Sequence, residues 1–131
     1  MIKHLWMLAL GLALLMPRTM AAQDLSGLAR VVPEGSVMKD VTGGVEITLA
    51  LTQGVPFRVF TLADPERLVM DFREVNWSGV EAETVDQADG VFAVRMGGFR
   101  PGWSRMVVDL NAPFAVATAN AEIDAASGGA R

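Results

Sequence analysis

The sequence predicts an all-β protein, a small β-sandwich of two similar antiparallel sheets preceded by a signal peptide. Two observations predict the sandwich: short apolar segments recur at regular spacing, and turns containing Gly or Pro separate them. A third observation predicts the leader, because an apolar run at residues 5–16 follows the positively charged Lys3. That run is too short for a membrane span, which needs about 20 residues.

Residues 1–21 have the order of a secretory signal peptide. Pro17 ends the apolar run, and Thr19 and Ala21 are small residues of the kind that a signal peptidase recognises. We therefore expect cleavage after Ala21 and a periplasmic location, with an uncleaved anchor as the alternative. The sequence has no cysteine, so neither a lipid-attached cysteine nor a disulfide framework is expected, and the exported domain must rely on its core.

Alternation of apolar and polar residues predicts the strands. In VEITLAL, at residues 45–51, four aliphatic side chains fall on one face and Glu46, Thr48 and Ala50 on the other. The Gly pair at residues 43–44 predicts a tight turn before this strand, and so a hairpin. The expected strands span residues 36–41, 45–51, 57–62, 67–72, 91–96, 105–110 and 111–119.

Three stretches are expected to be irregular. Residues 73–90 lack a strand pattern and predict a loop with one helical turn near residues 81–87. The segment GGFRPGWS at residues 97–104 predicts a long turn. Residues 120–131 are small and polar, which predicts a flexible linker or tail after a folded domain at residues 28–119.

One phrase occurs twice, as RLVMDF at residues 67–72 and as RMVVDL at residues 105–110. In a strand, each phrase places its Arg and Asp on one face and three apolar residues on the other. The similarity extends into the surrounding segments and suggests two related strand groups, one in each of two facing sheets. The alternative is that a β protein simply reuses turn and strand phrases.

The outward faces of these strands are the candidate ligand-binding surface. A guanidinium is a rigid fork of five donors that suits carboxylate, amide and sugar oxygens, and Asp accepts hydrogen bonds from hydroxyls. The candidate residues are Arg58, Arg67, Asp71, Arg95, Arg100, Arg105 and Asp109. Spacing alone favours a simpler interpretation, a solvated strand face with weak cross-strand ion pairs. Trp77 and Trp103 either stack on sugar rings or line the rim of the core.

Composition argues against several kinds of site. The single His is His4, inside the leader, so a Ser-His-Asp triad, a Cys-His pair and a His-ligated zinc are not expected in the exported chain. We predict no metal site, no cofactor and no enzyme activity for this chain alone. Removal of Lys3 and Arg18 with the leader leaves nine basic residues against 15 acidic ones, a net charge of −6. This balance argues against nucleic acid and anionic lipid as partners.

The ordered motifs resemble the AMIN domain. The resemblance covers about residues 36–119 and is carried by VEITLALTQGVPFRVFTLADPERLVMDF and VRMGGFRPGWSRMVVDL. The matching residues are Phe57, Arg58, Phe60, Asp64, Pro65, Arg67, Leu68, Val69, Asp71, Arg95, Gly97, Phe99, Arg100, Pro101, Gly102, Arg105, Val107, Asp109 and Leu110. AMIN domains are N-terminal modules of periplasmic N-acetylmuramoyl-L-alanine amidases and also occur in outer-membrane secretin components.

The resemblance implies a sandwich of two similar small sheets and a targeting module that binds peptidoglycan and places an amidase at the division septum. It also implies that the zinc of such an amidase is held by a separate C-terminal domain, and nothing in this chain resembles that domain. We expect a fragment of a cell-wall amidase, with a stand-alone module as the alternative. The second hypothesis is a protein-interaction module of an envelope or secretin complex, with septal or envelope proteins as partners.

Overall fold

The computed structural model describes residues 28–131. The predicted signal peptide and its cleavage at Ala21 lie outside the described residues. Within the described part of the chain, no helix has both the length and the apolar character needed to cross a bilayer.

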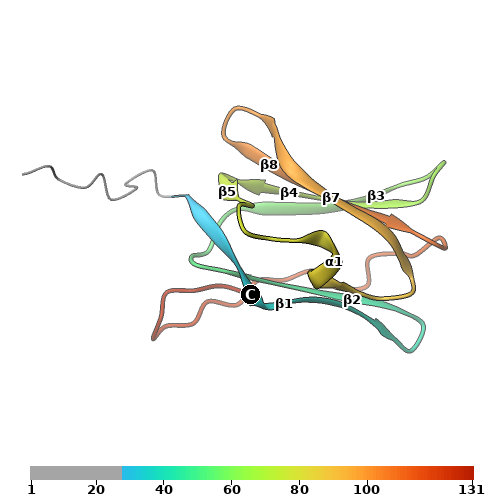
Figure 1. Ribbon diagram of the computed structural model, residues 1–131, viewed down its shortest axis with the longest axis horizontal. Coiled ribbons are helices and arrows are strands. Elements are labelled where there is room, and N and C mark those ends of the chain that lie inside the picture. The colour runs from blue at the N-terminus through green and yellow to red at the C-terminus, as the bar shows by residue number, and fades with distance from the viewer. Residues whose placement is uncertain (1–27) are drawn as a thin grey trace, which may run out of the picture.

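Two four-stranded sheets form the two layers of the described fold (Figure 1). The first sheet consists of β1 (Ala29–Val41), β2 (Gly44–Leu51), β5 (Val75–Asn76) and β6 (Asp86–Gln87), with β1 paired to the other three. The second sheet consists of β3 (Phe57–Leu62), β4 (Arg67–Arg73), β8 (Trp103–Leu110) and β7 (Val91–Arg100), in that order. A single helical turn, α1 (Ala82–Val85), lies between β1 and β7.

The predicted all-β sandwich is confirmed. Every pair in the second sheet is antiparallel, as is the long β1–β2 pair. The short strands β5 and β6 pair with β1 in parallel and lie within the segment predicted as a loop with one helical turn. The helical turn is present, at Ala82–Val85.

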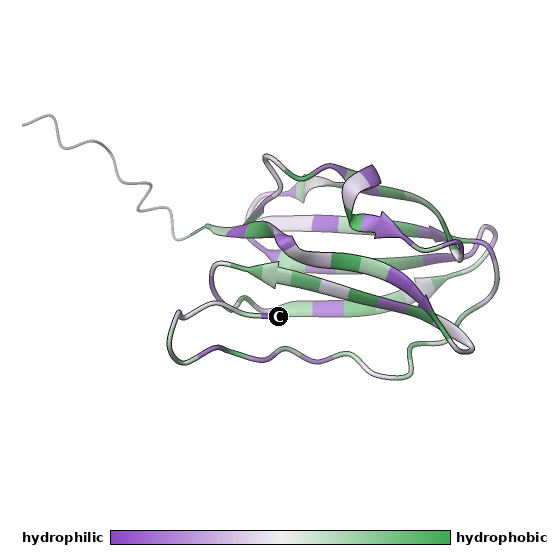
Figure 2. Ribbon diagram, turned by 60° about the horizontal axis from the view of Figure 1, so that its bottom comes forward, coloured by the Kyte–Doolittle hydropathy of each residue, from purple (hydrophilic) through white to green (hydrophobic). Residues whose placement is uncertain are grey.

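The core forms because apolar residues alternate along the strands and meet between the layers. Met38 of β1 and Met106 and Val108 of β8 have no exposed surface. Phe72 of β4 stacks on Phe57 of β3. Figure 2 shows hydrophobic and hydrophilic residues alternating along the strands, as expected for sheets with one buried face. Complete burial of one such side chain contributes about 1.5–3 kcal/mol.

β1 begins earlier than the sequence predicts. A register shift lies between Val32 and Val37 and interrupts the alternation of apolar and polar residues. The sequence pattern therefore does not reveal the first half of the strand. Ser36 replaces the missing ladder bonds: its hydroxyl donates to the Val32 carbonyl at 2.9 Å and accepts from the Ala50 N–H at 3.0 Å. The buried serine therefore stabilises the irregularity within one long strand.

The predicted long turn at residues 97–104 is wrong. β7 continues to Arg100 and β8 begins at Trp103, so that only Pro101 and Gly102 remain outside the strands. Gly102 has φ of 77°, a left-handed conformation that favours glycine. The glycines at residues 97–98 therefore belong to a strand, and only the Pro-Gly pair makes the turn.

The predicted strand at residues 111–119 is absent. This segment follows β8 as an extended chain without strand pairing. Pro113 removes one backbone donor, which disfavours strand pairing at that position. Further along, the backbone of Ala130 pairs with that of Leu51 through hydrogen bonds of 2.8 and 3.0 Å. The linker role of residues 120–131 stays a prediction.

The repeated phrases do not lie in separate sheets. RLVMDF in β4 and RMVVDL in β8 are neighbouring antiparallel strands, with Arg67 opposite Asp109 and Asp71 opposite Arg105. Two copies of Arg-x-x-x-Asp that run in opposite directions place each Arg against an Asp. The repeat therefore produces complementary charges across one strand pair, and the prediction of one phrase in each sheet is wrong.

Candidate functional site: an arginine-rich sheet face

The outer face of the second sheet gathers the candidate residues. Because Met70, Phe72, Met106 and Val108 enter the core, the alternate residues of β4 and β8 point to the other side of the sheet. We call this surface the arginine face. Its residues are Arg58 and Phe60 on β3, Arg67, Asp71 and Arg73 on β4, Trp103, Arg105 and Asp109 on β8, and Arg95, Gly97, Phe99 and Arg100 on β7.

A row of residues crosses all four strands at the centre of the arginine face. Asp71 lies between Arg58 on one side and Arg105 on the other, and Arg105 lies opposite Gly97. Arg105 donates from Nε to Oδ1 of Asp71 at 2.7 Å and from Nη2 to Oδ2 at 3.0 Å, a bidentate pair. From the other side, Arg58 donates from Nε to Oδ2 at 2.7 Å. One carboxylate thus holds two guanidinium groups.

Asp71 is fully buried although it lies on the outer side of the sheet. The side chains of Arg58 and Arg105 are 56% and 32% exposed, so they cover the carboxylate while their own charge still reaches solvent. The hydrogen bonds from Arg105 lower the pKa of Asp71 from its ordinary value of 3.8; burial opposes this effect and Arg58 adds to it. The same hydrogen bonds raise the pKa of Arg105. Asp71 and Arg105 therefore both remain charged at neutral pH.

Two phenylalanines hold the guanidinium groups in place. The Cζ atom of Arg105 lies 4.1 Å from the ring centroid of Phe99 and 5.9 Å from that of Phe60. The Cζ atom of Arg58 lies 5.4 Å from the Phe60 ring. Cation–π contacts of this kind contribute about 0.5–1 kcal/mol at exposed sites. The arginines are fixed by rings as well as by a carboxylate, so they present their remaining donors in a defined arrangement.

A second cluster lies at the turn between β7 and β8. Trp103 has the Cζ of Arg73 at 5.6 Å and that of Arg100 at 5.4 Å from its ring centroid. Arg100 also contacts Phe99, which links this cluster to the central row. Neither Arg73 nor Arg100 forms an ion pair with a residue of the described chain. Within the described chain, these two positive charges have no carboxylate at ion-pair distance.

Charge is strongly segregated on this molecule. Six of the nine basic residues between positions 28 and 131 lie on the arginine face, accompanied by Asp71 and Asp109. The whole chain nevertheless has a net charge of −4. A positive surface on an acidic protein attracts anionic groups to one place and repels them elsewhere.

All seven predicted candidate residues lie on the arginine face, but they do not form one cluster. The central row contains Arg58, Asp71 and Arg105, and Arg100 stacks beside it. Arg95 pairs with Asp109 at 3.2 Å near the other end. Arg67 is opposite Asp109 in register, yet its Nε donates to the Pro65 carbonyl at 3.1 Å. Ligand binding by these residues stays a prediction.

Four residues of the face are not among the candidates that the sequence predicted: Phe60, Arg73, Gly97 and Phe99. Phe60 and Arg73 lie two residues from Arg58 and from Asp71, so the same alternation would have found them. Phe99 continues the alternation of Arg95 and Gly97, but the sequence predicts a turn at residues 97–104, so the alternation was not extended to it. The register shift between Gly98 and Arg100 brings Arg100 to the same face.

The two tryptophans differ in environment. Trp103 lies between two arginines, whereas Trp77 packs against the core, with its ring 5.7 Å from that of Phe72 in an edge-on arrangement. The core-rim interpretation therefore holds for Trp77. Its Nε1 is buried and has no hydrogen-bond partner in the described structure.

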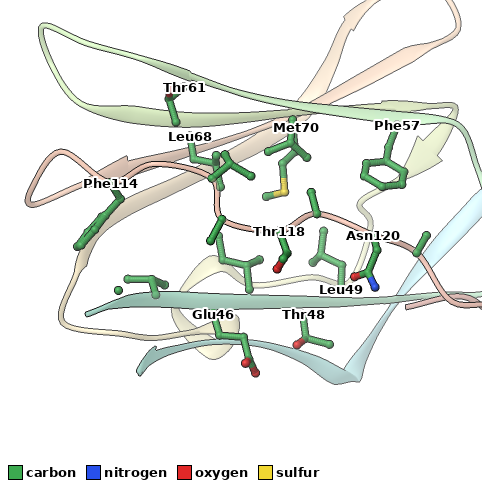
Figure 3. Close-up of a pocket in the computed structure, with 18 of the residues that line it drawn as sticks. Glu46, Thr48, Leu49, Phe57, Thr61, Leu68, Met70, Phe114, Thr118 and Asn120 are labelled. Atoms are coloured by element: carbon green, nitrogen blue, oxygen red, sulfur yellow. The ribbon is translucent and has the colours of Figure 1, made fainter. Parts of the chain in front are cut away.

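A cavity of about 870 Å³ lies on the inner side of the sandwich, between the edges of β2 and β3. Figure 3 shows Phe57, Leu68 and Met70 lining it from the second sheet, with Glu46 pointing away. The segment that includes Phe114, Thr118 and Asn120 runs along its mouth. Its walls combine apolar side chains such as Phe57, Leu68 and Met70 with polar ones such as Thr118 and Asn120.

The described residues contain no group of three His, Cys, Asp or Glu side chains that could hold a metal ion. The residues of the arginine face form hydrogen bonds, charge pairs and stacking contacts. These interactions serve recognition, and Asp71 is held in its charged form under two arginines, the opposite of what a proton donor requires.

Comparison with known proteins identifies the family. The family model described as the AMIN domain matches residues 37–129, well over half of the 131 residues. No curated protein matches the sequence. The matched segment contains both sheets except for residues 29–36 of β1, and it includes every residue of the arginine face. The chain therefore belongs to the AMIN domain family.

Proposed function

We propose that this chain is a peptidoglycan-binding module that targets its protein to the cell wall in the periplasm. The observation that carries the proposal is the arginine face, with its row of fixed guanidinium groups and its stacked rings. Membership of the AMIN family supports it, since the resemblance to periplasmic targeting modules implies this ligand.

The shape and chemistry of the face suit a polymer. Peptidoglycan carries sugar hydroxyls, amides and carboxylates, all of which accept hydrogen bonds from guanidinium donors. Phe99 is 37% exposed and adds aromatic surface on which an apolar face of a sugar can stack. The face is the open side of a four-stranded sheet, so an extended strand can cross it without having to enter an enclosed pocket.

Within a longer protein, we propose that the module delivers a zinc-dependent N-acetylmuramoyl-L-alanine amidase domain to the division septum. The module itself would bind without catalysis, and the zinc would belong to the amidase domain. A fluorescent fusion of the chain, exported to the periplasm of dividing cells, tests the septal part. Uniform labelling of the envelope would contradict septal targeting while leaving wall binding intact.

Co-sedimentation with purified sacculi tests wall binding directly. We expect the purified chain to pellet with sacculi and the double variant Arg67→Ala/Arg105→Ala to remain largely in the supernatant. Lys39→Ala is the matched control, because it removes a positive charge from the first sheet. Circular dichroism must show that all variants are folded. A folded wild-type chain that stays in the supernatant would contradict the proposal.

A protein-interaction module of an envelope or secretin complex is the second candidate. The observation that favours it is the cavity between the edge strands β2 and β3. Within the described residues, the outer edge of β2 pairs with Ala130 at Leu51 only. A partner strand could pair with such an edge and place apolar side chains in the cavity. Cross-linking from Thr61 in β3, compared with cross-linking from Thr48 in β2, would detect it; no cross-linked partner in the envelope would argue against this candidate.

A further inference from the structure

The guanidinium groups of the arginine face have more donors and more positive charge than the described chain satisfies. Arg58 and Arg105 share the single carboxylate of Asp71, and their Nη1 atoms have no hydrogen bond to another described residue. Arg73 and Arg100 stack on Trp103 without an ion pair to the described chain. A neutral glycan would satisfy the donors but would leave this charge uncompensated.

The β7 position of the central row is occupied by a glycine and has no side chain. Gly97 lies opposite Arg105, on the same side of the sheet, and a Cβ atom added there would meet no atom within 4 Å. The open space at Gly97 therefore lies beside the Arg105 side chain and the β7 backbone. A small planar group can approach the guanidinium there without displacing any side chain.

We propose that the arginine face recognises free carboxylates of the peptidoglycan stem peptide. This inference rests on the proposed function and assigns the part of the polymer that is bound. Guanidinium groups pair with carboxylates through two parallel hydrogen bonds, and such charge-assisted bonds are about twice as strong as neutral ones. The N-acetylated sugars of the intact glycan are uncharged, so the stem peptides supply the carboxylates that match this face.

Carboxylate blocking is the central experiment. Binding of the wild-type chain is measured on native sacculi and on sacculi whose carboxylates have been converted to amides with carbodiimide and methylamine. We expect at least a tenfold loss of affinity on the amidated sacculi and a steep weakening of native binding with salt. Sacculi with acetylated amino groups are the matched control and should bind like native ones.

The outcomes separate this inference from the proposed function. Equal binding to native and amidated sacculi overturns the carboxylate assignment and leaves peptidoglycan binding in place. Absence of binding to native sacculi overturns both. A soluble stem tetrapeptide should compete with native sacculi, whereas the same peptide with its carboxylates amidated should not. Failure of the free-acid peptide to compete overturns the assignment to the stem peptide.

A pair of glycine variants tests the position of the site. Gly97→Val fills the open space beside Arg105, and we expect about tenfold weaker binding to native sacculi with unchanged folding. Gly44→Val is the matched control, because a Cβ atom at Gly44 of β2 also meets no atom within 4 Å. Equal binding by the two folded variants would show that no ligand group approaches Gly97.

Discussion

The outer faces of the two sheets follow the same alternating pattern but differ in how their charged residues are held. On the first sheet, Lys39 and Glu46 form an ion pair of 3.5 Å in which both side chains are 55% exposed. On the second, Asp71 is fully buried beneath two arginines that approach to 2.7 Å. The comparison teaches that alternation predicts the direction of a side chain, whereas its solvation depends on which neighbours cover it.

The largest expected effect is on stability. Asp71→Ala removes the carboxylate that separates Arg58 and Arg105, and we expect it to lower the free energy of unfolding by about 2–3 kcal/mol. This is less than the full cost of breaking a buried pair, because both arginines can still reach solvent. Glu46→Ala on the first sheet should cost less than about 0.5 kcal/mol. Urea denaturation measures both free energies of unfolding, and equal decreases would contradict the difference between the two sheets.

The same carboxylate makes stability depend on pH in a predictable direction. The pKa of Asp71 is lower in the folded protein than its ordinary value of 3.8, so ionised Asp71 stabilises the fold. This contribution is fully present above about pH 4 and is lost as pH falls through the lower folded value. We therefore expect the stability difference between wild type and Asp71→Asn to shrink in acid. A difference that stays constant from pH 7 to pH 2 would contradict this.

A smaller effect distinguishes a buried hydroxyl from a partly exposed one. Ser104 of β8 donates a hydrogen bond to the Val75 carbonyl of β5 at 2.7 Å, and so connects the two sheets. Ser104→Ala leaves this carbonyl without its partner, and we expect a loss of about 1–2 kcal/mol. Thr48→Ala, on the outer side of β2, should cost less than about 0.5 kcal/mol. Thermal or urea unfolding of the two variants side by side is the measurement.

Much of the fold could be predicted from the sequence, because burial of one face imposes a period of two. The strand at residues 57–62 and the directions of the side chains in RLVMDF and RMVVDL follow from this period alone. The full length of β1 could not be predicted, because a register shift interrupts its alternating pattern. The short turn at Pro101 could not be predicted either, because the glycine pair before it looks like the end of a strand. The absent strand at residues 111–119 shows that an apolar segment also needs a pairing partner.

The candidate site was only half predictable. Spacing placed Arg58, Asp71 and Arg105 on an outer face, and antiparallel pairing of the two repeated phrases then brought Asp71 and Arg105 together. Spacing could not show that Asp71 is buried, because the covering arginines come from two other strands. Nor did spacing place Phe99 over Arg105, because residues 97–104 predict a turn, whereas β7 continues to Arg100.

The last expected effect concerns binding to sacculi and separates the positive charge of Arg105 from the geometry of its guanidinium donors. Arg105→Lys keeps the positive charge but loses the fork that holds Asp71 and a ligand together, so we expect about tenfold weaker binding to sacculi, roughly 1.4 kcal/mol. Arg95→Lys, in the exposed pair with Asp109, should change binding less than about twofold. Similar affinities for the two lysine variants would mean that the face acts through charge alone.

The central claim is that the arginine face, and not the first sheet or the inner cavity, contacts peptidoglycan. An NMR titration of the isotope-labelled chain with soluble muropeptides tests it most directly, with backbone amides and arginine Nε–H groups as probes. We predict the largest shifts at Arg58, Arg105 and Gly97, with little change at Lys39 and Glu46. Shifts confined to β2 or to the cavity between β2 and β3 would contradict the account.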